Sequence, residues 1–292
     1  MAITASLVKE LRERTGAGMM DCKKALTETG GDMEAAIDLM RTSGAAKAAK
    51  KAGRVAAEGL VKVSISEDKK TVTVLEVNSE TDFVTKGADF INFVDTLGEL
   101  ALKTKPNNIE EFLSQQLENG DSMEKAREEI VAKVGENVEI RRVQTVEAGK
   151  GVIGAYKHGE KIAVVTLLEG GDSSLAKDIA MHIAATRPEC VSEEELSPEL
   201  LEREKAIFIE QARESGKPDN IIEKMIVGRM KKFVNEVTLY GQSFVKDPDI
   251  TVAELAKSNN ATVKSFVRFE VGEGIEKKEE NFADEVMSQV QG

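Results

Sequence analysis

The stretch GLVKVSISEDKKTVTVLEV, residues 59–77, decides the fold. Apolar and polar residues alternate on both sides of SEDKK, which is typical of two strands joined by a turn. Helical patterns follow at 88–102 and around 123–134, and the first of them, ADFINFVDTLGELAL, carries an apolar stripe. The alternating segment NVEIRRVQTVE, residues 137–147, then predicts a third strand. Together these segments predict a three-stranded antiparallel sheet that is covered by helices.

The same order of elements occurs a second time. The segment GVIGAYKHGEKIAVVTLLEG, residues 151–170, predicts a second hairpin that turns near His158 and Gly159. It is followed by the helical pattern DSSLAKDIAMHIAAT at 172–186 and, much later, by the strand pattern NATVKSFVRFEVGEG at 260–274. We therefore predict an α+β fold whose core has two related units, each with a three-stranded antiparallel sheet and helices.

Further helical segments surround and interrupt this core. Apolar residues recur at helical spacing in the first 45 residues, where Asp32 has the position of a helix N-cap. An insertion at 188–237 predicts two helices that are joined by SGKPDN and held by an apolar coiled-coil seam. The predicted domains are an N-terminal three-helix module with its linker at 1–54, core unit 1 at 55–148, core unit 2 at 149–187 and 238–274, the inserted helical hairpin at 188–237, and a C-terminal helix at 275–292.

Composition and charge limit the classes of function. The chain has 292 residues and a net charge of −12, which disfavours broad binding to the phosphates of nucleic acids. No apolar run is long enough to span a bilayer, and the N-terminus lacks the pattern of a secretory signal, so we expect a cytoplasmic protein without membrane contact. The two cysteines, Cys22 and Cys190, and two histidines give no disulfide framework and no metal-ligand spacing, so neither a metal nor a cofactor is expected.

We find no catalytic constellation in the sequence. TGAGMMDCKK and EAGKGV contain glycines but lack the Gly-Lys-Ser/Thr ending of a phosphate-binding loop. We expect His158 to be exposed in a hairpin turn and His182 to pack on an apolar helical face. The sequence therefore indicates a multi-module binding protein rather than an enzyme. A cryptic enzyme and an RNA-associated factor, which would use KAAKKAGR (47–54) and RMKKF (229–233), remain as alternatives, although the net charge counts against the second.

The segment NSETDFVTKG, residues 78–87, stands at the corner between the first hairpin and its helix. Such corners favour small polar residues, yet Asp82 and the bulky Phe83 lie here side by side. In a purely local interpretation, Asp82 caps a helix and Phe83 acts as a hydrophobic staple. The corresponding corner of the second unit contains only GGDSS. The first corner is therefore the specialised one, and we expect its acid and its ring to be presented to another protein.

Four segments resemble a known family. LRERTGAGMMDCKKAL at 11–26 and EVNSETDFVTK at 76–86 resemble the two signature segments of bacterial elongation factor Ts, the guanine-nucleotide exchange factor for elongation factor Tu. The resemblance continues through KPDNIIEKMIVGRMKKF at 217–233 and VRFEVGEGIEK at 267–277, with Thr85 standing where Ser or Ala is expected. It implies a translation elongation factor that acts through protein–protein contact. The implied fold has a three-helix, UBA-like N-terminal module, a two-part core, a coiled-coil insertion and a C-terminal helix.

The resemblance also implies roles for individual residues. The segment that enters the nucleotide domain of elongation factor Tu, disturbs its magnesium site and promotes GDP release corresponds to Thr81, Asp82, Phe83 and Val84. The N-terminal segment that contacts a helix of that domain corresponds to Arg12, Met19 and Met20. In this family the C-terminal module contacts the same domain, and the second core unit faces another domain of the partner. A homodimer through 188–237 remains open.

Overall fold

The computed structural model describes residues 3–15, 17–214 and 218–276. Contacts within the chain divide it into two compact units. Of the described residues, the first unit contains 3–15, 17–64, 73–145 and 270–276, and the second contains 65–72, 146–214 and 218–269. Most of the predicted C-terminal helix, residues 277–292, lies outside the described residues.

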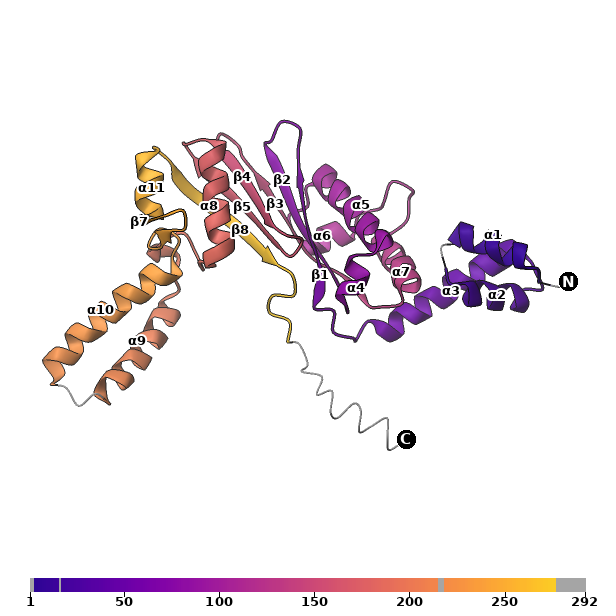
Figure 1. Cartoon of the computed structure of the whole chain (residues 1–292), viewed down its shortest axis with the longest axis horizontal. Coiled ribbons are helices and arrows are strands. Elements are labelled where there is room, and N and C mark those ends of the chain that lie inside the picture. Colours follow the sequence, from indigo (N-terminus) through magenta and orange to yellow (C-terminus); the bar gives the residue numbers. More distant parts are fainter. Residues whose placement is uncertain (1–2, 16, 215–217, 277–292) are drawn as a thin grey trace. The chain divides into compact units, whose positions relative to one another are not determined.

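Three helices form the N-terminal part of the first unit, as predicted (Figure 1): α1 (Ala5–Thr15), α2 (Met19–Glu28) and α3 (Met33–Lys51). Their small core includes Leu11, Cys22 and Leu26, which are fully buried. The Asp32 side chain accepts a hydrogen bond from the Ala35 N–H at 3.0 Å, which confirms the predicted N-cap. Because α3 continues to Lys51, most of the basic segment KAAKKAGR, residues 47–54, is part of the third helix.

A three-stranded sheet and its helices contribute most of the rest of this unit. The strands are ordered β1-β2-β3. The elements are β1 (Glu58–Ile65), β2 (Thr71–Ser79), α4 (Asp82–Thr85), α5 (Ala88–Thr104), α6 (Ile109–Leu113), α7 (Met123–Val134) and β3 (Val138–Glu147). The stripe of α5 is buried, and a Cβ at Gly98 would lie 2.6 Å from Lys62 Cγ, so the helix lies close to β1. The central strand β2 is buried at every position, including its polar residues.

The second unit repeats this plan with the strand order β4-β5-β8. Its elements are β4 (Val152–His158), β5 (Ile162–Glu169), α8 (Ser173–Thr186) and β8 (Thr262–Glu270). β4 and β5 pair antiparallel, from Val152 opposite Leu168 to His158 opposite Ile162. α8 lies directly on β4, because a Cβ at Gly154 would come within 2.2 Å of the carbonyl carbon of Ala176.

The predicted helical hairpin is present between α8 and β8. It consists of α9 (Pro198–Arg213) and α10 (Asp219–Val237), and its seam buries Ala212, Ile222 and Ile226. Phe208 and Phe233 add an edge-to-face contact with ring centroids 6.3 Å apart. Among the described residues, six short elements were not predicted from the sequence: α4, α6, η1 (Glu193–Glu195), β6 (Ser243–Phe244), β7 (Asp247–Thr251) and α11 (Val252–Ser258).

The structure confirms the predicted fold class, an α+β protein with N-terminal helices and two three-stranded antiparallel sheets. The limits of the five predicted domains stay a prediction. Within the described residues, no helix is long and apolar enough to cross a membrane.

Candidate functional site

The corner after β2 is the candidate site. β2 ends at Ser79, Thr81 occupies the N-cap position, and the single turn α4 follows. Phe83 points outward, with 82% of its surface exposed. Val84 packs against the core of the first unit, and the buried Thr85 donates its hydroxyl to the Asp82 carbonyl oxygen at 2.9 Å. The corner is therefore anchored on its inner side while the ring of Phe83 faces solvent.

The local interpretation of Asp82 and Phe83 is wrong. The N-cap is Thr81, not Asp82, and no side-chain hydrogen bond caps α4. Asp82 instead forms an ion pair with Lys86, with the oxygen and nitrogen 2.6 Å apart and both side chains substantially exposed. Such surface pairs contribute at most about 1 kcal/mol to stability, so a partner could displace the lysine at little cost. Phe83 is too exposed to be a hydrophobic staple.

The corner is held by a residue that the sequence reasoning missed. Glu136, in the loop between α7 and β3, accepts three hydrogen bonds from the corner. The donors are the Ser79 hydroxyl at 2.9 Å, the Thr81 N–H at 2.9 Å and the Thr81 hydroxyl at 2.6 Å. In the opposite direction, Glu80 of the corner accepts a hydrogen bond from the N–H of Asn137, the residue after Glu136, at 2.6 Å. Each of the two segments thus supplies a carboxylate to the other.

The end of α3 joins the same network. The Asn137 side chain donates to the Arg54 carbonyl oxygen at 2.9 Å, and Arg54 lies 3.5 Å from the Glu80 carboxylate. Lys51 donates to the Gly135 carbonyl oxygen. We call these hydrogen bonds among residues 51–54, 79–81 and 135–137 the clasp. No periodic pattern could have revealed it, because its three segments are far apart in the sequence.

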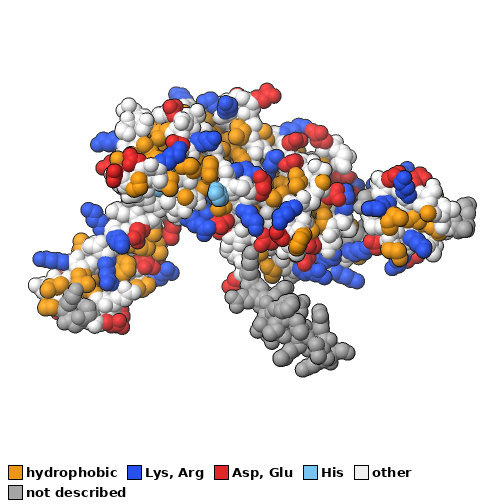
Figure 2. All heavy atoms as spheres, viewed as in Figure 1, with side chains coloured by type: hydrophobic (Ala, Val, Ile, Leu, Met, Phe, Trp, Pro, Cys, Tyr) orange, Lys and Arg blue, Asp and Glu red, His pale blue; other side chains and the backbone are white. Residues whose placement is uncertain are grey.

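The three N-terminal candidate residues are all exposed. Arg12 is exposed on α1, and Met19 and Met20 at the start of α2 expose 46% and 75% of their surfaces. Figure 2 shows hydrophobic side chains at the surface of the N-terminal helices, among charged ones. An ion pair of 3.1 Å between Asp21 and Lys47 places the start of α2 beside the second half of α3. This is the half of α3 that ends at the clasp.

The histidines have the environments that the sequence predicted. His182 is fully buried; its Nε2 lies 2.9 Å from Gln242 Oε1, and its Nδ1 accepts the Val245 N–H at 3.2 Å. Burial lowers the pKa of His182, and the hydrogen bond to Gln242 opposes that effect only in part. His158 is exposed at the end of β4. Within the described part of the chain, no group of three or more His, Cys, Asp or Glu side chains could hold a metal ion.

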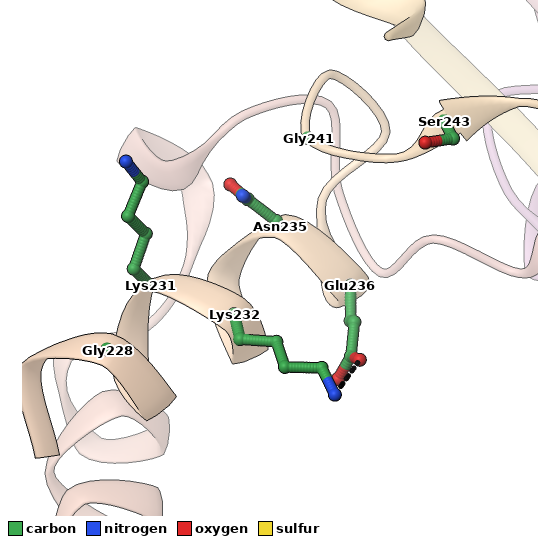
Figure 3. A pocket seen from close by; sticks show the side chains of 7 residues that line it. All are labelled: Gly228, Lys231, Lys232, Asn235, Glu236, Gly241 and Ser243. Carbon is green, nitrogen blue, oxygen red and sulfur yellow. Dashed lines mark ion pairs between the residues drawn. The ribbon is translucent and has the colours of Figure 1, made fainter. Parts of the chain in front are cut away.

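Two basic segments had been considered for RNA contact. In the segment 47–54, Lys47, Lys51 and Arg54 make the intramolecular contacts described above. A shallow pocket beside α10 (Figure 3) is lined by Gly228, Lys231, Lys232, Asn235, Glu236, Gly241 and Ser243. There Lys232 forms an ion pair with Glu236 at 3.6 Å, and Lys231 points away from it. These lysines do not converge on one anion site, so the geometry gives no support to an RNA contact.

Comparison with known proteins gives one consistent result. The family described as elongation factor TS matches residues 80–273. The chain is 80% identical to elongation factor Ts of Ruthia magnifica subsp. Calyptogena magnifica over 292 residues, which is 100% of this chain and 99% of that protein. It is 71% identical to elongation factor Ts of Vesicomyosocius okutanii subsp. Calyptogena okutanii, covering 99% and 100% of the two chains. It is 57% identical to elongation factor Ts of Alkalilimnicola ehrlichii, with both chains covered completely.

Proposed function

The chain belongs to the elongation factor Ts family, and from this premise we propose that it is a guanine-nucleotide exchange factor. It binds elongation factor Tu that carries GDP, promotes the release of GDP and so allows exchange for GTP. It acts by protein–protein contact in the cytoplasm and forms no covalent intermediate. The observation that carries the proposal is the exposure of Phe83, a large ring held outward on an anchored corner beside an acid.

The mechanism follows from what a nucleotide site needs. Magnesium requires near-octahedral oxygen ligation and bridges the protein to the phosphates of the nucleotide. Close-packed elements of the partner cannot deform smoothly, so a rigid ring inserted between them shifts them as a unit. Phe83 supplies that volume, and Asp82 supplies a negative charge close to the metal site. The partner's magnesium sphere is disturbed and GDP is loosened without a bond being broken.

We call the inserted Phe83 ring the wedge. The N-terminal helices supply a second binding surface that holds the protein on its partner while the wedge is inserted. Met19 and Met20 offer flexible apolar side chains on α2, and the exposed Arg12 adds a charge on α1. An exposed apolar patch with a charged rim is a common form of protein-binding surface. We propose that this patch packs against a helix of the partner's nucleotide domain. The second core unit and the C-terminal segment add further contacts.

Release of a fluorescent GDP analogue from elongation factor Tu tests the proposal. We expect Phe83→Ala to lower the maximal release rate roughly tenfold or more, as truncation of an interface anchor typically does. Asp82→Ala should cause a smaller loss. Leu113→Ala is the matched control, because Leu113 is an apolar residue of α6 that is 44% exposed away from the corner. If Phe83→Ala binds the partner and releases GDP as fast as the unchanged protein, the wedge mechanism is wrong.

A further inference from the structure

We infer that Glu136 is a positioning residue that fixes the Thr81–Val84 corner in the orientation in which Asp82 and Phe83 meet the partner. The inference rests on the proposed function but adds a residue outside the signature segment. Glu136 precedes β3 and is separated from Thr81 by 55 positions in the sequence. It acts through the corner and makes no contact with the partner itself.

The orientation of α4 and Phe83 depends on contacts from outside the corner. α4 has only four residues, and a helix this short is not stable by itself. The Thr81 side chain does not cap it, and Phe83 has little packing of its own. An exposed ring on an unsupported turn would sample many orientations, and the entropy lost on binding would weaken its effect.

Glu136 meets this need with one carboxylate. Its two oxygens accept from two hydroxyls and one backbone N–H of residues 79–81, at 2.6–2.9 Å. Hydrogen bonds to an ionised acceptor are about twice as strong as neutral ones. Since one of these bonds engages backbone, they fix the direction in which the chain enters α4. The reverse bond from Asn137 N–H to Glu80 prevents the two segments from sliding past each other.

In the second unit, the corresponding corner packs against the segment before β8, because a Cβ at Gly170 would lie 2.2 Å from the Asn260 carbonyl oxygen. There Asp172 caps α8 locally by accepting the Leu175 N–H at 2.9 Å. In the first unit, Thr81 is the N-cap residue of α4, but its side chain does not cap that helix and its hydroxyl donates to Glu136 instead. The Thr81 side chain, which could have capped α4, thus binds the loop between α7 and β3.

The clasp also connects the corner to the N-terminal helices. α3 ends in the clasp through Lys51 and Arg54, and the second half of α3 carries the contact to the start of α2. The N-terminal segment is thus linked to the clasp through α3, by the ion pair between Asp21 and Lys47.

The test compares Glu136→Ala with Glu136→Gln. Alanine removes every acceptor, whereas the glutamine oxygen can still accept from the Thr81 N–H while its NH₂ group donates to the Thr81 hydroxyl, which can reverse its role. We expect Glu136→Ala to lower the maximal rate of GDP release from elongation factor Tu roughly tenfold, with the half-saturating concentration little changed. Glu136→Gln should restore most of the rate. Glu139→Gln, at an exposed position on β3, is the control.

Hydrogen–deuterium exchange of the protein alone gives a readout that needs no partner. In Glu136→Ala, exchange should rise in residues 79–85 and stay unchanged in residues 162–186, which belong to the second unit. Unchanged exchange at 79–85 would overturn the inference, as would a rise in both regions or an effect on the half-saturating concentration alone. If the unchanged protein does not accelerate GDP release, the proposed function fails, and the exchange data still decide whether Glu136 fixes the corner.

Discussion

At the scale of single residues, Phe83 and His182 represent opposite uses of a ring. Phe83 leaves 82% of its surface in water, although a buried phenylalanine would contribute roughly 1.5–3 kcal/mol to stability. That contribution is absent at the corner, and binding to a partner is the physical reason we propose. His182 is fully buried, and both of its ring nitrogens have partners. It serves the fold alone, and its protonation must oppose folding.

The buried His182 predicts a pH dependence of stability. Burial holds its folded-state pKa below the ordinary value of 6.5, so the unfolded chain takes up the proton first as the pH falls. The free energy of unfolding should therefore decrease below about pH 6.5, by up to about 1.4 kcal/mol per pH unit. Urea unfolding between pH 7.5 and about pH 5 measures this slope. His182→Gln should flatten it, and the exposed His158→Gln should not; equal slopes in all three proteins would contradict the assignment.

At the scale of elements, the long patterns were predictable and the short elements were not. α5, α8 and the two hairpins carry several turns or strand repeats of apolar periodicity, so each pattern is legible in the sequence alone. β6 has two residues and α11 has seven, which is too short for a periodic signal. α11 depends instead on a capping box between Thr251 and Glu254. β2 is buried on both faces, and the alternation of its residues could not reveal that.

The helical hairpin allows a prediction with neighbouring residues as test and control. Ile226 is 9% exposed in the seam, and Val227 beside it is 70% exposed. Ile226→Ala should destabilise the hairpin by about 2 kcal/mol, because the described part of the seam buries only Ala212, Ile222 and Ile226. Limited proteolysis should then cleave within 198–237 faster, while Val227→Ala should be cleaved at the rate of the unchanged protein. Equal cleavage of both variants would mean that the seam does not hold the two helices together.

At the scale of the whole molecule, part of the candidate site was accessible from the sequence and part was not. Phe83 could be singled out because a bulky ring departs from the usual composition of a turn, and its pairing with Asp82 because the second unit has no acid beside a ring at its corner. Glu136 could not, since one glutamate in an acidic chain of net charge −12 carries no local signal. Its importance arises only when folding brings the loop at 135–137 to the corner at 79–81. A residue that only positions a site, such as Glu136, is thus harder to predict from the sequence than the residues proposed to contact the partner.

The coupling between GDP and this chain on elongation factor Tu involves the complete protein and its partner, and it acts equally in both directions. If binding of this chain weakens GDP binding to elongation factor Tu, then GDP must weaken binding of this chain by the same factor. A coupling of about 3 kcal/mol would correspond to roughly 150-fold in affinity. Sedimentation of the chain with elongation factor Tu should show a complex that GDP and Mg²⁺ dissociate, and sedimentation of the chain alone reports any homodimer through 188–237. Phe83→Ala, which loosens GDP less, must also be displaced less by GDP. A variant that lost exchange but kept the full sensitivity of its complex to GDP would show that Phe83 affects the rate of release without contributing to the coupling.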